Sequence, residues 1–192
     1  SWGVDFAFWC HYKHINAGPG AVGGLYLNRR HFHRAPGLAG WFGSRPEKQF
    51  EMGLEFDPAM GAQGLQIGTP AILSMAPLVG SLQIFEEAGI ENIRRKSLLL
   101  NTYFRTLVEE YASDYGLRCI TPETESRRGG HTTYEHLHAS QLLEALGREG
   151  IVVDYRPPNL IRFAPIALYN TFEECYLVAQ TLKALLQQGG YE

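Results

Sequence analysis

Residues 9–24, WCHYKHINAGPGAVGG, hold one lysine, Lys13, between aromatic and histidine neighbours and ahead of a glycine-rich turn. The preceding segment VDFAFWC (residues 4–10) is rich in aromatic and β-branched residues and predicts a strand. The following segment AVGGLYLN (residues 21–28) predicts a second strand, so the glycines connect the two. Lys13 is therefore expected at the end of a strand. Three roles are open for it: a surface charge, a phosphate contact or a nucleophile. Partial desolvation between its aromatic neighbours would favour the neutral amine that a nucleophile needs.

The glycines of this turn, Gly18, Gly20 and Gly23, match the spacing G-x-G-x-x-G of dinucleotide-binding loops. That motif needs a strand before it and a helix after it. Here Pro19 interrupts the motif and a strand is predicted to follow. A tight connection between two strands is therefore the better interpretation, and we expect no nucleotide site.

The composition limits the classes of partner. The chain has 192 residues, of which 45% are hydrophobic, and a net charge of -3, which gives no electrostatic reason to expect nucleic acid or an anionic membrane. No apolar run approaches the roughly 20 residues of a membrane-spanning helix. The three cysteines, Cys10, Cys119 and Cys175, are widely spaced and odd in number. They predict buried free thiols in a reducing, cytoplasmic compartment.

The pattern of the chain divides it into two parts of an α/β fold. Residues 34–69 are rich in Gly, Pro and aromatic residues without a clear period, which predicts a long ordered loop of the kind that serves function. From residue 70 onward helices and strands alternate densely enough to close a core. We therefore expect residues 1–69 to be the end of a larger domain and residues 70–192 to be linking helices and a small α/β domain.

The second part has clear helix and strand signals. Helices are predicted at residues 70–89 and 90–116, each ended by a glycine. Ser140 is the expected N-cap of another helix, and Thr171 with Glu174 forms a capping-box pattern at the start of the last one. Short strands are predicted at residues 117–121, 131–138, 151–156 and 159–165.

The histidines do not predict a metal site. His136 and His138 are expected on one face of a strand, with His131 close in sequence. No carboxylate or cysteine stands at a known ligand spacing, and the sequence lacks H-E-x-x-H. Arg128, beside two glycines, fits a charged turn better than a phosphate clamp. The roles of Arg128 and His131 stay open.

Arg162 stands in the apolar stretch NLIRFAP (residues 159–165), where burying a charge is costly unless it is paired. A buried arginine commonly binds a carboxylate through two parallel hydrogen bonds. The spacing is equally compatible with a structural ion pair and with the carboxylate of a ligand.

Four stretches, in order and over essentially the whole chain, resemble the kynureninase family of pyridoxal phosphate (PLP) enzymes. They are residues 2–27, 38–52, 65–73 and 160–174, and they include CHYKHINAGPG, GWFG, QIGTP and LIRFAP. The first resembles the family's Schiff-base stretch, in which a Tyr-Lys pair precedes Asn-x-Gly. The resemblance implies the C-terminal part of fold type I, the aspartate-aminotransferase fold, of the class V group.

The resemblance also implies roles for individual residues. Lys13 matches the lysine that forms the Schiff base with PLP, and Tyr12 the tyrosine that binds the cofactor phosphate and helps in proton transfer. Trp41 and Thr69 match residues that reach the phosphate in the neighbouring subunit, which makes the site the property of a homodimer. Arg162 matches the arginine that holds the α-carboxylate of the substrate.

The implied reaction is hydrolysis of L-kynurenine to anthranilate and L-alanine, in tryptophan degradation and NAD biosynthesis. The choice between L-kynurenine and 3-hydroxykynurenine stays open. Alternatives are another class V enzyme, such as a cysteine desulfurase or an aminotransferase, and a catalytically incomplete fragment that acts only in an assembly. A desulfurase needs a cysteine on a mobile loop, whereas Cys119 and Cys175 are predicted in a strand and a helix.

The sequence departs from the family in length, since the family's enzymes are roughly twice as long. The family's N-terminal half carries an aromatic that stacks on the cofactor ring and an acid that pairs with the pyridine nitrogen. It also carries an Asp-x-x-His stretch, and neither Asp5 nor Asp57 matches that stretch. We therefore expect this chain alone to hold PLP poorly and to have no activity.

Overall fold

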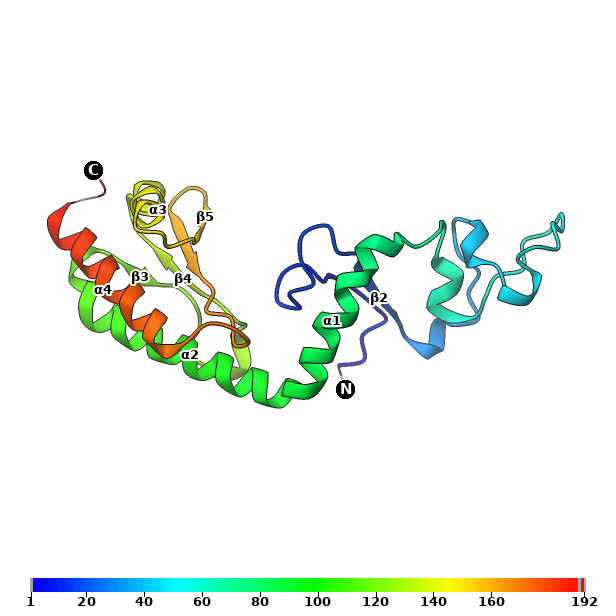
Figure 1. Cartoon of the computed structure of the whole chain (residues 1–192), viewed down its shortest axis with the longest axis horizontal. Coiled ribbons are helices and arrows are strands. Elements are labelled where there is room, and N and C mark those ends of the chain that lie inside the picture. Colours follow the sequence, from blue (N-terminus) through cyan, green and yellow to red (C-terminus); the bar gives the residue numbers. More distant parts are fainter. Residues whose placement is uncertain (1, 190, 192) are drawn as a thin grey trace. The chain divides into compact units, whose positions relative to one another are not determined.

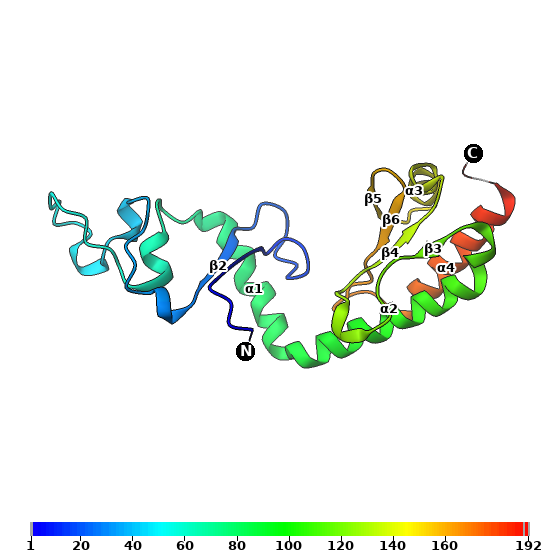
Figure 2. The same cartoon turned by 180° about the vertical axis from the view of Figure 1, so that it is seen from behind.

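The computed structural model describes residues 2–189 and 191, and it forms two compact units, residues 1–87 and residues 88–192 (Figures 1 and 2). Within the described residues, no helix is both long and apolar enough to cross a membrane. The expected functional division, into residues 1–69 and 70–192, stays a prediction.

The first unit is built on a β-hairpin and a helix. Strands β1 (Phe6–Cys10) and β2 (Gly23–Leu27) pair in antiparallel fashion, with Phe6 opposite Leu27 and Cys10 opposite Gly23. Helix α1 (Ile72–Ala88) follows the long loop and is tied to the hairpin connection, because the Ser74 carbonyl accepts a hydrogen bond from the Val22 N–H. Both strands and the helix are as predicted.

The long loop of residues 34–69 is confirmed as a segment without α-helices or extended strands. It contains three short 3₁₀ helices, at Trp41–Gly43, Pro46–Lys48 and Gly61–Leu65, and one isolated bridge between Ser44 and Pro58. The loop is therefore ordered by short turns rather than by a hydrophobic core of its own.

The second unit is a four-stranded antiparallel sheet in the order β3-β4-β6-β5, packed against helices. Helices α2 and α4 lie side by side, as both views show (Figures 1 and 2). The elements are α2 (Ile90–Ala112), β3 (Arg118–Cys119), β4 (Thr132–Glu135), α3 (Ala139–Arg148), β5 (Asp154–Arg156), β6 (Leu160–Phe163) and α4 (Phe172–Gln188).

The core of the second unit joins these helices to one face of the sheet. Phe104 of α2 contacts the rings of Tyr134 and Phe163, at centroid distances of 6.2 and 5.0 Å. Aromatic pairs in such tilted and edge-on arrangements stabilise the fold beyond what the burial of their apolar surface contributes. Other fully buried members are Leu100, Val108, Leu142, Leu146, Ile161 and Leu182.

The prediction of strand histidines is wrong. Strand β4 ends at Glu135, so His136 and His138 lie beyond it, and His138 rather than Ser140 is the N-cap residue of α3. The ring of His136 turns inward: its Nε2 is 3.1 Å from the Tyr115 carbonyl oxygen, and its Nδ1 accepts the backbone N–H of His138. The His136 N–H still donates to the Asn159 carbonyl oxygen at 3.0 Å, so main-chain pairing extends to this residue although the strand has ended.

Two smaller predictions have mixed outcomes. The capping box of Thr171 and Glu174 is present at the start of α4. Of the three thiols, only that of Cys175 is buried, and burial raises its pKa to about 11. Cys10 and Cys119 are half-buried, so the expected burial is wrong for them.

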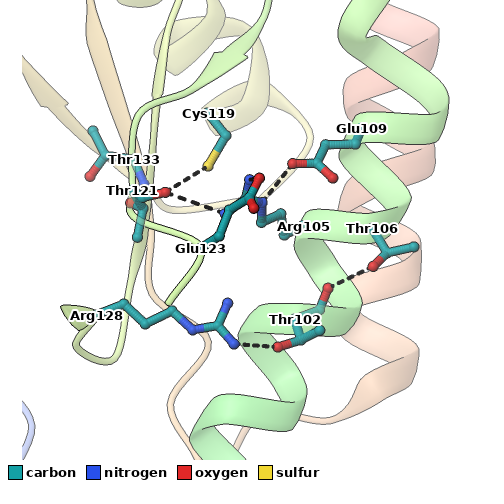
Figure 3. A network of polar contacts seen from close by, with 9 residues as sticks. All are labelled: Thr102, Arg105, Thr106, Glu109, Cys119, Thr121, Glu123, Arg128 and Thr133. Carbon is teal, nitrogen blue, oxygen red and sulfur yellow. Dashed lines mark hydrogen bonds and ion pairs between the residues drawn. The ribbon is translucent and has the colours of Figure 1, made fainter. Parts of the chain in front are cut away.

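A polar network fastens the β3–β4 connection to helix α2 (Figure 3). The Arg105 guanidinium donates to the Thr121 carbonyl oxygen, and the Thr121 hydroxyl accepts the Thr133 N–H at 2.8 Å. Arg128 donates to the Thr102 hydroxyl at 2.7 Å, and its side chain is almost fully buried. Arg128 thus holds the turn in place, a structural role that the sequence left open.

Candidate functional site

Lys13 lies in a tight turn that closes the hairpin end. The Lys13 carbonyl oxygen accepts the Asn16 N–H, and the His11 carbonyl oxygen accepts the Ala17 N–H, both at 2.9 Å. Asn16 adopts φ 58°, a left-handed conformation that asparagine tolerates better than most residues. The local sequence therefore fixes the backbone on both sides of the lysine.

His11 is a supporting residue that sequence reasoning missed. Its ring is buried, its Nε2 accepts the Trp9 indole N–H at 2.8 Å, and its Nδ1 is 2.6 Å from the Val22 carbonyl oxygen. The His11 ring therefore connects the ends of the two strands, next to the turn that carries Tyr12 and Lys13. The signal was the Trp9-Cys10-His11 spacing, because residues two apart on an extended chain share a face.

The expected partial desolvation of Lys13 is not found. Both Lys13 and Tyr12 are exposed, and the lysine Nζ lies 5.5 Å from the centroid of the Tyr12 ring. The tyrosine offers its face to the ammonium, a contact that keeps the two side chains together but excludes little water. The prediction was wrong because the aromatic neighbours of Lys13 in sequence do not cover it within this unit.

Trp41 and Thr69 belong to two segments that the structure brings together. A Cβ atom added to Gly40 would lie 2.2 Å from the Ile67 carbonyl oxygen, and one added to Gly43 would lie 2.6 Å from that of Gly64. Only glycine permits so close an approach of two backbones. The GWFG stretch therefore packs closely against residues 64–67, which lie just before Thr69.

These side chains fit a phosphorylated aldehyde in their chemistry. Lys13 offers an amine, and Tyr12 and Thr69 offer exposed hydroxyl groups, which are suitable donors to phosphate oxygens. The Trp41 indole N–H is already used, since it donates to the Gln49 carbonyl oxygen at 3.1 Å. Trp41 must exchange this bond before it can serve a phosphate group.

Arg162 lies in the second unit, on strand β6, between Ile161 and Phe163, which point into the core. Its side chain is half-buried and donates through Nη2 to the carboxylate of Asp154. The structural ion pair that the sequence left open is therefore present. The joint site of Arg162 with Lys13 stays a prediction, as do all five site assignments.

No cluster of three or more His, Cys, Asp or Glu side chains that could hold a metal ion occurs within residues 2–189 and 191. The rings of His136 and His138 are tilted by 55° with centroids 5.9 Å apart, and both contact the ring of Tyr191. Burial lowers the pKa of His136, which keeps that imidazole neutral.

Solved structures of class V PLP-dependent enzymes have the same fold as this chain over about half of their own length. The apo structure of a cysteine desulfurase from Thermococcus onnurineus NA1 superposes with a TM-score of 0.76 at 18% identity, over 96% of this chain and 48% of that one. A C-DES mutant with glycine covalently linked to its PLP cofactor gives a TM-score of 0.73 at 19% identity, over 94% of this chain and 46% of that one. This confirms the predicted fold class.

The sequence comparison is more specific. Residues 93–182 match the kynureninase C-terminal domain. The chain is 53% identical to kynureninase from Geobacillus thermodenitrificans and 52% identical to that from Shouchella clausii, each over 191 residues and all of this chain. The chain spans 45% and 44% of these relatives. Its whole length is thus similar to the C-terminal part of kynureninases, which confirms the resemblance.

Proposed function

We propose that this chain supplies the C-terminal part of a PLP-dependent kynureninase, a hydrolase that cleaves the Cβ–Cγ bond of L-kynurenine to give anthranilate and L-alanine. The observation that carries the proposal is the identity of about half of all residues with curated kynureninases along the entire chain. Fold likeness alone would favour desulfurases equally, but at 18–19% identity it bears on the fold only.

Each predicted site residue has a role in this reaction. PLP, when bound, supplies the electron sink that stabilises carbanions. The amine of Lys13 would hold the cofactor through its aldehyde and would act as the base that takes the substrate's Cα proton. Tyr12 binds the cofactor phosphate and aids proton transfer, and Arg162 holds the α-carboxylate so that the Cα–H bond is correctly oriented.

Trp41 and Thr69 are proposed to donate to the cofactor phosphate of a neighbouring subunit, so that a homodimer shares its active sites. The close packing of the GWFG stretch against residues 64–67 supports this proposal, because it holds the segments that carry the two donors next to each other. A cytoplasmic location and a part in tryptophan degradation and NAD biosynthesis complete the proposal.

The test is a Lys13→Ala substitution in a protein of kynureninase length that contains this chain. We expect the visible absorption band of the bound cofactor and kynurenine hydrolysis to be lost together. Lys183→Ala is the matched control, because Lys183 lies over the Tyr111 ring at 4.7 Å in the second unit. Retention of the visible band after Lys13→Ala would overturn the assignment.

The isolated 192-residue chain is proposed to bind PLP weakly and to lack activity. This follows from the exposure of Lys13 and Tyr12, which leaves the amine in water rather than in the dry pocket that its chemistry requires. Kynurenine hydrolysis by the isolated chain would contradict this. Parallel assays with kynurenine and cysteine separate a kynureninase from a desulfurase, whose loop cysteine has no counterpart in Cys119 of β3 or Cys175 of α4.

A further inference from the structure

The outer face of the sheet in the second unit carries a row of polar side chains centred on Arg162. Its strand partners are Asp154 on β5 and Thr133 on β4. Successive residues of a strand point to opposite faces, and Ile161 and Phe163 point into the core. Asp154, Arg162 and Thr133 therefore lie side by side on the face opposite the core.

Asp154 is shared between two arginines. Its Oδ2 accepts a hydrogen bond from Nη2 of Arg162 and lies 3.2 Å from Nη2 of Arg156. Glu135, an acid on the same face, is already bonded to Arg118 and to Asn159. One carboxylate thus faces two guanidinium groups, and the cluster keeps an excess of positive charge.

Arg162 also has unused hydrogen-bond donors. Within the described part of the chain, only its Nη2 makes a hydrogen bond, which leaves Nε and Nη1 without a partner. The side chain as a whole is 32% exposed. A guanidinium binds a carboxylate best through two parallel N–H groups, and holding it on one side in advance reduces the entropy lost on binding.

We propose that Asp154 positions Arg162 for the α-carboxylate of the substrate and that Arg156 prevents Asp154 from neutralising it. The inference rests on the proposed function, because it takes the ligand of Arg162 to be that carboxylate. Asp154 fixes the guanidinium through one nitrogen, while Arg156 shares the negative charge of the same oxygen. The ion pair and the ligand site that the sequence left as alternatives are then one arrangement.

The test uses Asp154→Asn in a protein of kynureninase length that contains this chain and is loaded with PLP. The probes are L-alanine and ethylamine, which is L-alanine without its carboxylate, and their dissociation constants are measured from the change in the cofactor spectrum. We expect the dissociation constant of L-alanine to rise about tenfold, as for the loss of one hydrogen bond between charged groups, and that of ethylamine to stay unchanged. The KM for kynurenine should rise while kcat changes little.

Two further variants make the result specific. Arg156→Gln should weaken L-alanine binding by a smaller factor, because Asp154 then neutralises Arg162 more fully. Glu135→Gln is the matched control, since Glu135 lies on the same face of the sheet and its ion pair is with Arg118. This control should leave the ratio of the two dissociation constants unchanged.

The possible outcomes are distinct. Tighter L-alanine binding in Asp154→Asn would show that Asp154 competes with the ligand, and equal weakening for both probes would show a purely structural role; either result overturns the inference. Failure of the unsubstituted protein to hydrolyse kynurenine would instead overturn the proposed function. Circular dichroism confirms that each variant is folded.

Discussion

The two units bury their aromatic residues to very different degrees. In the second unit Phe104 is 2% exposed and lies among the rings of Tyr134 and Phe163. In the first unit Phe8, on a strand of the hairpin, is 87% exposed. A two-stranded sheet cannot bury both of its faces, whereas four strands with three helices enclose a core. A strand signal in the sequence therefore reveals nothing about whether the strand is covered.

The largest expected effect tests this contrast directly. Phe104→Ala should lower the free energy of unfolding by about 3–5 kcal/mol, because it removes a buried ring and leaves a cavity. Urea unfolding of the 192-residue chain, followed by far-UV circular dichroism, measures it. Phe8→Ala is the matched control and should change the free energy by less than about 0.5 kcal/mol, as for exposed sites. Similar losses in both variants would contradict the contrast.

A smaller effect is expected at helix starts. In the capping box of α4, the Thr171 hydroxyl accepts the Glu174 N–H at 3.1 Å. Thr171→Ala removes this bond and should lower the free energy of unfolding by about 1 kcal/mol. In the first unit, Asn28 caps only the three-residue 3₁₀ helix Arg29–His31. Asn28→Ala should therefore cost clearly less in the same urea titration. An equal cost would show that the first unit depends on its caps as much as the second does.

The smallest expected effect is a pH dependence that arises in the second unit. Burial lowers the pKa of His136 below 6.5, so the unfolded chain binds more protons than the folded one below that pH. The free energy of unfolding should then be fully present above pH 6.5 and fall as the pH is lowered through the depressed pKa. Titrations from pH 8 to pH 5 measure it, and His136→Gln should reduce the slope.

The exposed His33 of the first unit provides the control for this experiment. His33→Gln should leave the pH profile of the unfolding free energy as it is in the unsubstituted chain. If His33→Gln rather than His136→Gln removed the slope, the pH dependence would arise in the first unit and the prediction would be contradicted.

Local signals in the sequence predicted most elements of the fold. The glycine turn between β1 and β2, the end of α1 just before Gly89 and the capping box of Thr171 each depend on residues within a few positions of one another. Helix α2 instead ends at Ala112, and only the 3₁₀ helix Ser113–Tyr115 reaches the predicted end at Gly116. The errors occurred where a distant partner decided the outcome. His136 lies beyond its predicted strand, with its ring Nε2 3.1 Å from the carbonyl oxygen of Tyr115, 21 positions away in sequence.

The candidate site shows the same division. Resemblance in sequence implies a joint site of Tyr12, Lys13, Trp41, Thr69 and Arg162, which stays a prediction. It did not reveal that the Trp41 N–H is used by Gln49 or that Lys13 is exposed. Both depend on which surfaces lie over a side chain, and no local spacing encodes that.

The sequence by itself determined the family resemblance, the α/β class and the positions of the helices, because these depend on residue types at short and regular spacings. Only the tertiary structure decided which charges meet. Asp154 and Arg162 are eight positions apart and become partners because β5 and β6 pair in one register, in which Asp154 faces Arg162. A shift of that register by one residue would turn the two side chains to opposite faces of the sheet and separate the pair.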